Sequence, residues 1–265
     1  MMATLPKPRD ASAGERAVKV DVEVSHSFGA LCVHDGLQFA VRENEFLCVC
    51  GPSGCGKTTL LDILAGLLKP TRGRVLVHGE AVDPKRHNIS FVFQEPSTLP
   101  WLTVRDNVAM GLRIKKRPAA ELRRVVDDIL GVVNLRGYED YYPHQISGGM
   151  KQRVAIARAF ATDADVILMD EPFVSLDQPT RERMQAEVLS IWGRKKGTII
   201  FVTHNLEEAV FLGDRTIVLS AKPARILADV PITLPRPRNT LSPEFTRLRA
   251  QFAGLLNSAV LSNAG

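Results

Sequence analysis

The chain has 265 residues, of which 45% are hydrophobic and 24% are charged, the composition of an ordinary globular protein with one or two domains. Its net charge of +5 is divided among short basic runs, such as 115–117 and 194–196, and forms no continuous tract of the kind that binds nucleic acid. No apolar run approaches the roughly 20 residues of a membrane-spanning helix, and residues 1–16 lack a signal peptide's apolar core, so we expect a disordered tail there.

The N-terminal part of the chain is predicted to consist mainly of strands. They are expected, from alternating or continuous apolar runs, at 18–24, 37–41, 46–50, 74–78 and 89–93. A turn at Gly29 separates the first two, and the last delivers Gln94 at its end. Between the third and fourth, a helix over 59–65 is expected to end near Leu68, because Pro70 and Gly73 follow.

The rest of the chain is predicted to alternate helices with buried strands. Helical spacing covers 103–135 with a break at Pro118, then 149–161, 180–195 and 243–256. Continuous apolar runs at 166–169 and 198–202 are typical of parallel strands buried on both faces. Asn205 is a predicted helix N-cap, and Glu208 three residues later completes a capping-box pattern. This alternation predicts an α/β nucleotide-binding core.

The four cysteines, Cys32, Cys48, Cys50 and Cys55, show neither zinc spacing nor a disulfide framework. Cys48 and Cys50 are two residues apart on one strand, so we expect both on the same face as small buried hydrophobes. A metal or redox role is the weaker alternative. Free thiols fit a reducing cytosol.

Residues 51–58 match the phosphate-binding pattern G-x-x-x-x-G-K-[ST] at every fixed position, between a predicted strand and a predicted helix. Glycines let successive backbone N–H groups point at one anion, and the helix N-terminus adds partial positive charge. Lys57 is predicted to reach the β- and γ-phosphates and Thr58 to ligate Mg²⁺. The nucleotide-binding residues predicted here are Gly51, Pro52, Ser53, Gly54, Cys55, Gly56, Lys57, Thr58 and Thr59.

Two further groups of residues have the chemistry of a phosphate-loop ATPase. Asp170, at the end of a buried strand, is predicted to hold Mg²⁺ through water, and Glu171 to act as the general base. Both could instead be surface carboxylates at a strand end. Ser147, Gly148 and Gly149 open a helix that could bind a γ-phosphate, although alone they could be only a loop and an N-cap.

The ordered set of motifs resembles the ATP-binding subunit of ATP-binding-cassette (ABC) transporters over residues 18–235. In that comparison Gln94 is similar to the Q-loop glutamine, residues 147–152 to the signature motif, and residues 175–177 to the D-loop. His204 resembles the switch histidine and Phe28 the aromatic residue that stacks on adenine, although Phe28 could also be a core residue beside Gly29. Asn205 departs from the family's usual Asp, and Gln178-Pro179 after the D-loop is less usual.

The resemblance implies a fold, a chemistry and an assembly. The α/β phosphate-loop NTPase core would carry a small antiparallel β-subdomain and a helical subdomain at about 94–161, within an ABC domain at 17–235, followed by a helical extension at 236–265. ATP and Mg²⁺ are the implied cofactors. The implied catalytic residues are Glu171, His204, Gln94 and Lys57, and the implied metal ligands are Thr58, Gln94 and Asp170. Two copies would face each other head to tail, so that Ser147, Gly148 and Gly149 of one complete the ATP site of the other.

The resemblance also implies partners. An integral membrane permease would hold the chain at the cytoplasmic face of the inner membrane, a substrate-binding protein would act indirectly, and nucleic acid would play no part. Residues 94–103, with Leu99 and Trp101 at an apolar tip, are a candidate docking surface, unless Trp101 packs inside the helical subdomain. The alternatives are a soluble ABC ATPase acting on DNA or ribosomes, an unrelated phosphate-loop kinase, and an exporter.

The cargo is suggested only by sequence flanking the motifs. Those flanks, at 91–96, 99–101, 106–108, 148–153 and 207–210, resemble the nitrate, sulfonate and taurine branch of bacterial importers. A small oxyanion or a similar organic solute is therefore the expected cargo. None of these residues is expected to touch it, because selectivity in such a system lies in the binding protein and the permease.

Overall fold

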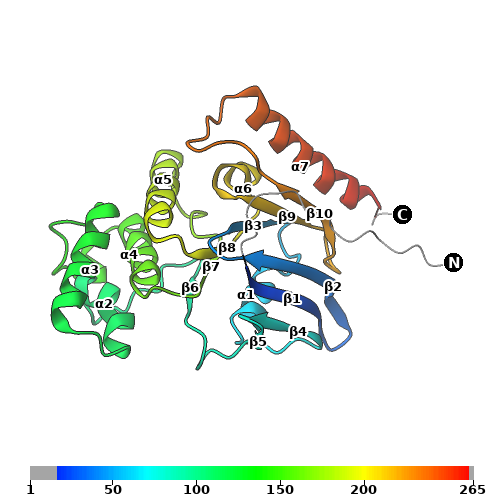
Figure 1. Cartoon of the computed structure of the whole chain (residues 1–265). Helices are drawn as coiled ribbons and strands as arrows, with labels where there is room; N and C mark the ends of the chain where they lie inside the picture. Colours follow the sequence, from blue (N-terminus) through cyan, green and yellow to red (C-terminus); the bar gives the residue numbers. More distant parts are fainter. Residues whose placement is uncertain (1–16, 263–265) are drawn as a thin grey trace.

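The computed structural model describes residues 17–262, so the tail predicted at 1–16 lies outside the described residues. A four-stranded antiparallel sheet contains the hairpin that the turn at Gly29 predicts (Figure 1). Its strands, in the spatial order β2-β1-β4-β5, are β1 (Val18–Phe28), β2 (Leu31–Arg42), β4 (Arg72–Val77) and β5 (Glu80–Ala81). This sheet is the predicted small antiparallel β-subdomain.

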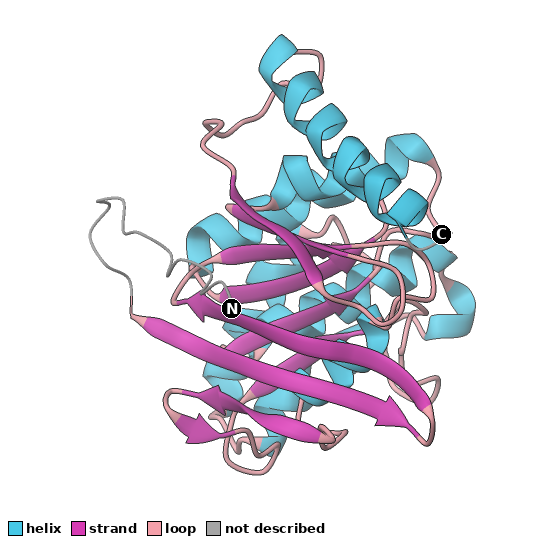
Figure 2. Ribbon diagram, turned by 90° about the vertical axis from the view of Figure 1, so that its right-hand side faces the viewer, coloured by secondary structure: helices cyan, strands magenta, loops and turns pink. Residues whose placement is uncertain are grey.

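The second sheet has six strands in the order β10-β9-β3-β8-β7-β6 and forms the centre of the molecule (Figure 2). Its members are β3 (Phe46–Cys50), β6 (Ile89–Val92), β7 (Val166–Asp170), β8 (Thr198–Thr203), β9 (Arg215–Leu219) and β10 (Ile226–Pro231). All neighbours are parallel except β10, which runs antiparallel to β9. Because β3, β7 and β8 are parallel and adjacent, their carboxyl ends bring distant residues to one edge of the sheet.

The strand β3 divides two apolar cores, one on each face of the central sheet. Leu47 and Val49 face a core shared with α1 (Lys57–Leu64) and the antiparallel sheet. Cys48 and Cys50 face the other core, which the remaining helices cover, and both are fully buried. Burial raises the pKa of the Cys50 thiol to about 12, which suits an inert thiol. The prediction of two small buried residues on one face is confirmed.

Helices of the helical subdomain form a separate group beside β6 (Figure 1). They are α2 (Val104–Ile114), α3 (Ala119–Val132), the short 3₁₀ helix η1 (Pro143–Gln145) and α4 (Gly148–Ala161). The predicted break at Pro118 is confirmed, because Pro118 is the N-cap of α3. Two further helices, α5 (Gln178–Lys195) and α6 (Leu206–Leu212), connect the strands of the central sheet. Within residues 17–262, no helix combines the length and the hydropathy needed to cross a bilayer.

The C-terminal helix α7 (Pro243–Ser262) lies across α6, β9 and β10 and buries Phe245 and Phe252 against them. The segment before it is fixed by Arg238, whose guanidinium is buried at the C-terminal end of α6. One guanidinium nitrogen donates to three backbone carbonyls there, those of Val210 at 2.7 Å, Phe211 at 3.0 Å and Gly213 at 2.6 Å. Arg238 therefore satisfies carbonyl groups that the helix end leaves without partners.

The structure corrects one expectation about secondary structure and shows two strands beyond those predicted. The helix α1 ends at Leu64 rather than near Leu68, because Gly66 adopts a left-handed φ of 71° and the N–H groups of Leu67 and Leu68 turn back to the Asp62 carbonyl. The strands β9 and β10 were not predicted. In β10 exposure alternates regularly, but the apolar Leu227 and Pro231 stand at exposed positions, so the sequence shows no apolar–polar alternation.

Candidate active site

The phosphate loop lies between β3 and α1, at the carboxyl edge of the central sheet. Gly54 and Gly56 have positive φ angles of 77° and 104°, a conformation that glycine adopts without strain. A Cβ on Gly56 would lie 2.4 Å from Cγ1 of Val33, so no larger residue fits there. The loop is thus shaped by its own glycines and by β2 packed beneath it.

His34 of β2 contacts the phosphate loop, and no sequence pattern predicts this contact. Its Nε2 lies 2.9 Å from the carbonyl oxygen of Gly56, and the side chain is fully buried. Burial lowers the pKa of His34, which favours a neutral ring that donates Nε2–H to this carbonyl. A histidine between Val33 and Asp35 in a strand gives no signal of this contact, which depends on how the two sheets pack.

Lys57 is buried within the loop that it follows. Its ammonium donates to the carbonyl oxygens of Gly51 and Pro52, each at 3.1 Å, and lies 3.4 Å from Oε1 of Glu171. The positive charge is therefore held at the mouth of the glycine loop, where the β- and γ-phosphates of a nucleotide are expected.

Two of the three predicted metal ligands, Thr58 and Asp170, meet across the sheet edge. The Thr58 hydroxyl donates to Oδ2 of Asp170 at 2.7 Å. Burial raises the pKa of Asp170, and the hydrogen bond from Thr58 acts in the opposite direction. A hydroxyl and a carboxylate supply the oxygen donors that Mg²⁺ prefers, with phosphates and water completing its shell, so this donor set fits the ion.

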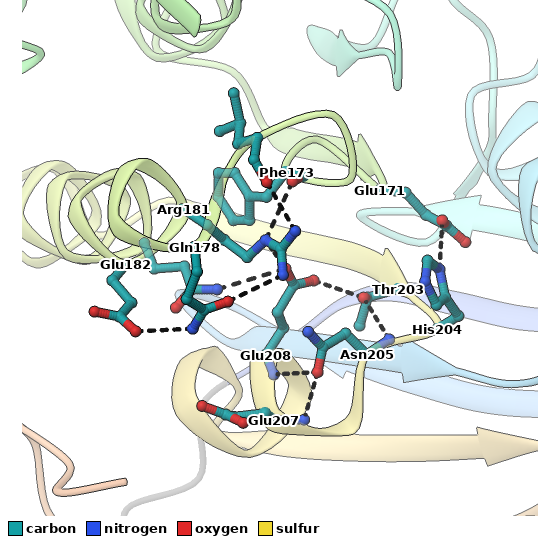
Figure 3. Close-up of polar contacts among 12 residues, drawn as sticks. Glu171, Phe173, Gln178, Arg181, Glu182, Thr203, His204, Asn205, Glu207 and Glu208 are labelled. Atoms are coloured by element: carbon teal, nitrogen blue, oxygen red, sulfur yellow. Dashed lines mark hydrogen bonds and ion pairs between the residues drawn. The ribbon is translucent and has the colours of Figure 1, made fainter.

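Glu171 follows directly after β7 and adopts a left-handed φ of 41°, unusual for a residue with a side chain. Such backbone strain costs about 1–3 kcal/mol and persists where the surrounding structure enforces it. The carboxylate lies between Lys57 and His204: its Oε2 is 2.6 Å from Nδ1 of His204 (Figure 3). An ionised Glu171 can only accept, so His204 donates this hydrogen bond.

Asn205 caps α6 as predicted, but the capping box does not form. The Asn205 side-chain oxygen accepts from the N–H groups of Glu207 and Glu208 at 2.9 Å and 3.4 Å. The carboxylate of Glu208 does not return to the Asn205 N–H, which instead donates to the Thr203 hydroxyl at 2.9 Å. Glu208 accepts from that same hydroxyl, so the sequence pattern was right about the cap and wrong about the glutamate.

The predicted site residues Gln94 and Ser147 lie outside this cluster. Gln94 is exposed in the loop after β6, two residues beyond the strand end at Val92. Ser147 is the exposed N-cap of α4, and its hydroxyl accepts from the Met150 N–H at 3.3 Å. Gly148 and Gly149 open the same helix, which belongs to the helical group and stands apart from α1 (Figure 1). Ser147, Gly148 and Gly149 therefore lie apart from the phosphate loop of their own chain.

The loop that carries Gln94 is held from α2 and α4 by residues whose roles the sequence did not reveal. The fully buried Gln152 donates to the Phe93 carbonyl at 3.3 Å, and Arg158 donates to the Ser97 carbonyl at 2.8 Å. Asn107, also buried, bonds the backbone at both ends of residues 99–103. Gln152 lies inside the signature motif, and only this position in the sequence indicates that it has a role.

Phe28 and Trp101 are both exposed aromatic side chains, which removes one alternative for each. Phe28, at the end of β1, is 52% exposed, so it is not a core residue. Its ring meets that of His26 edge to face, with the ring centroids 4.6 Å apart. Trp101 is 69% exposed, so it does not pack inside the helical subdomain. Each ring is free to meet a ligand or partner face.

Comparison with known proteins identifies the family. The sequence model of the family described as ABC transporter matches residues 34–174. The chain belongs to this family. Its ABC fold is supported by solved structures, among them cbiO1 from Clostridium perfringens, described as part of the ABC transporter complex cbiONQ. That chain superposes with a TM-score of 0.73 at 26% identity, over 81% of this chain and 88% of its own. The predicted α/β core with its two subdomains is thereby confirmed.

A second solved ABC cassette, the dimer MJ0796 in a post-hydrolysis state bound to ADP and Pi, has a TM-score of 0.70 at 30% identity, over 81% of this chain and 99% of its own. Among curated relatives, an uncharacterized ABC transporter ATP-binding protein of Methanocaldococcus jannaschii is 48% identical, over 86% of both chains. The aliphatic sulfonates import ATP-binding protein SsuB of Bacillus subtilis is 43% identical, over 82% of this chain and 84% of its own. The chain is thus an ABC ATPase that binds ATP.

Proposed function

We propose that this ABC ATPase energises an importer for an organic sulfonate or a similar small oxyanion. The observation that carries the proposal is the similarity to SsuB proteins along nearly the whole cassette. The SsuB of Bacillus cereus is 40% identical over 90% of this chain and 98% of its own. The nucleotide-binding motifs do not touch the solute, so they do not distinguish an alkanesulfonate from nitrate or taurine.

The chemistry would be divided among the residues of the sheet edge. The backbone of residues 51–58 and the Lys57 ammonium would bind the phosphates of ATP. Thr58 and Asp170, with Gln94, would hold Mg²⁺, which neutralises phosphate charge when bound. Glu171 would accept a proton from the attacking water, and His204 would hold that carboxylate in place through the 2.6 Å contact.

The active unit would be a head-to-tail dimer. The exposed N-terminus of α4, with Ser147 at its cap and two glycines after it, offers backbone N–H groups to an anion from outside the chain. In the proposed dimer this surface meets the γ-phosphate bound by the second copy. ATP would then favour the closed dimer and hydrolysis would release it, because only ATP contacts both copies.

A permease would hold the dimer at the cytoplasmic face of the membrane. The candidate contact is the loop at 94–103, where Trp101 projects and the backbone is fixed by Asn107 and Arg158. A rigid loop with an exposed aromatic tip suits a persistent protein contact. Since the same loop carries Gln94, movement of the permease would shift the position of Gln94 relative to the metal site.

The test is reconstitution of the chain with the permease and binding protein encoded beside it, in liposomes of bacterial lipid. We expect the binding protein loaded with an alkanesulfonate to raise the ATPase rate, and unloaded binding protein to raise it less. Nitrate, taurine and bicarbonate serve as competing cargos. If no such permease forms a complex with the chain and its ATPase rate is unaffected, the protein is an ABC ATPase that does not serve this transporter.

A further inference from the structure

Arg181 and Glu208 form an ion pair beside the proposed catalytic residues (Figure 3). Arg181 lies in the first turns of α5 and Glu208 in α6, and Nε of one is 3.9 Å from Oε1 of the other. Glu208 is buried, and Gln185 of α5 also donates to it at 3.5 Å. Neither member of this pair contacts the residues assigned to phosphate or metal binding.

Arg181 holds the backbone that follows Glu171. Its Nη2 donates to the Leu176 carbonyl at 2.8 Å and its Nε to the Phe173 carbonyl at 3.3 Å. These two carbonyls belong to the short loop that joins β7 to α5. Since Glu171 itself has a strained left-handed φ, the conformation of this loop must be enforced by contacts such as these.

Glu208 holds the residues on both sides of His204. The Thr203 hydroxyl donates to Oε2 of Glu208 at 2.6 Å and accepts from the Asn205 N–H at 2.9 Å. Thr203 is itself buried, so the hydroxyl has one fixed donor and one fixed acceptor. The backbone before and after His204 is therefore tied to a single carboxylate.

We propose that Arg181 and Glu208 are positioning residues that set the contact between Glu171 and His204, one through the loop after Glu171 and the other through Thr203. The inference deepens the proposed function, because it assumes the roles given above to Glu171 and His204. A single cavity of about 40 Å³ is lined by both members of the pair and by the residues they hold, so a shift of one changes the space available to the others. These lining residues include Arg181, Glu208, Glu171, Thr203, His204 and Asn205.

The charges of Arg181 and Glu208 suit a role in positioning neighbouring residues better than a role in stabilising the fold. Burial raises the pKa of Glu208, while the Thr203 hydroxyl and Arg181 oppose that shift. Replacing a buried ion pair by apolar residues of the same volume is often neutral or stabilising, so stability alone does not account for this pair. The planar guanidinium of Arg181 adds two directed bonds to backbone carbonyls, which an ammonium at the same place could not reproduce together.

The experiment compares variants of this network by their kcat, KM and ATP affinity. Glu208→Gln keeps the shape but places an amide against Arg181, and Thr203→Val removes the hydroxyl while keeping the branch. Both are expected to lower kcat by roughly 10- to 100-fold, the scale of a misplacement of about 1 Å, with ATP affinity unchanged. Thr203→Ser, which restores the hydroxyl, is expected to restore most of the rate. Calorimetric ATP binding verifies that each variant is folded.

A matched control is Glu207→Gln. Glu207 precedes Glu208 on α6 and carries the same charge, but it is partly exposed and pairs with Arg249 of α7 at 3.6 Å. Its variant should stay within about twofold of the parent rate, as expected for a surface charge.

Combination with His204→Ala separates positioning from general destabilisation. If Glu208 acts through His204, then Glu208→Gln causes no further loss in a chain that already has His204→Ala. Additive losses, or a parallel fall in ATP affinity, would show a merely structural role and overturn the proposal. Unchanged kcat in both Glu208→Gln and Thr203→Val, with His204→Ala inactive, would overturn it while leaving the proposed function intact. A parent-like rate for His204→Ala would contradict the role of His204 and the positioning proposal with it.

Discussion

The phosphate loop and the hydrolytic corner of the site are assembled in different ways. Lys57 bonds a carbonyl only six positions earlier in the chain, within one strand–loop–helix unit. The contact between Glu171 and His204 joins residues 33 positions apart, and that between Thr58 and Asp170 joins residues 112 apart. The bonds of Lys57 to the phosphate loop are thus local in the sequence, whereas the contacts of Glu171 and Asp170 depend on how distant elements pack. Variants that separate ATP binding from hydrolysis test this distinction.

The largest separation is expected from Glu171→Gln. The amide keeps the shape but cannot accept a proton, so hydrolysis should fall about 10²- to 10⁴-fold. ATP should still bind, because Lys57 keeps its bonds to Gly51 and Pro52. Phosphate release and calorimetry measure the two properties, and light scattering should show an ATP-dependent dimer. If the variant hydrolyses ATP normally and remains monomeric, Glu171 is not the general base and the ATP-dependent dimer is also contradicted.

The converse separation is expected from Lys57→Ala. Loss of a charged donor to phosphate costs about 1.5–3 kcal/mol, which corresponds to roughly 10- to 150-fold in affinity. The control is Lys69→Ala, since Lys69 is exposed beyond the end of α1. Calorimetry with Mg-ATP measures the effect. Equal affinity for Mg-ATP in the Lys57 variant and its control would contradict the assignment of residues 51–58 to phosphate binding.

The smallest effect is expected from Phe28→Ala, since this ring is proposed to stack on adenine without touching phosphate. Stacking of a base on an aromatic ring is worth about 1–3 kcal/mol, and for a half-exposed ring we expect the lower end. The rate at saturating ATP should not change. Leu31→Ala is the control, because Leu31 is equally exposed across the same turn. If both variants bind ATP as the parent does, Phe28 does not contact the base.

The sequence was sufficient for the features that short-range patterns encode. The glycine loop, the buried strand before Asp170 and the Asn205 cap each depend on a few consecutive residues, and all three are present. Two kinds of feature were not predictable. The edge strand β10 shows no apolar–polar alternation because the apolar Leu227 and Pro231 stand at its exposed positions, and the partners of Glu208 and His34 are set by how neighbouring elements pack. A local pattern assigned Glu208 to a backbone N–H, but in the fold a nearby hydroxyl and a guanidinium compete for it.

Arg238 bears on how short a working form of this protein can be. Its guanidinium supplies the donor for three carbonyls at the end of α6, and each buried carbonyl left without a partner costs about 1–3 kcal/mol. That helix begins two residues after His204. A gene fragment that stops at residue 235 would retain every strand of the central sheet but would lose both this donor and α7, so we expect it to weaken the helix that follows His204. We therefore expect a working ATPase to need residues beyond its last strand.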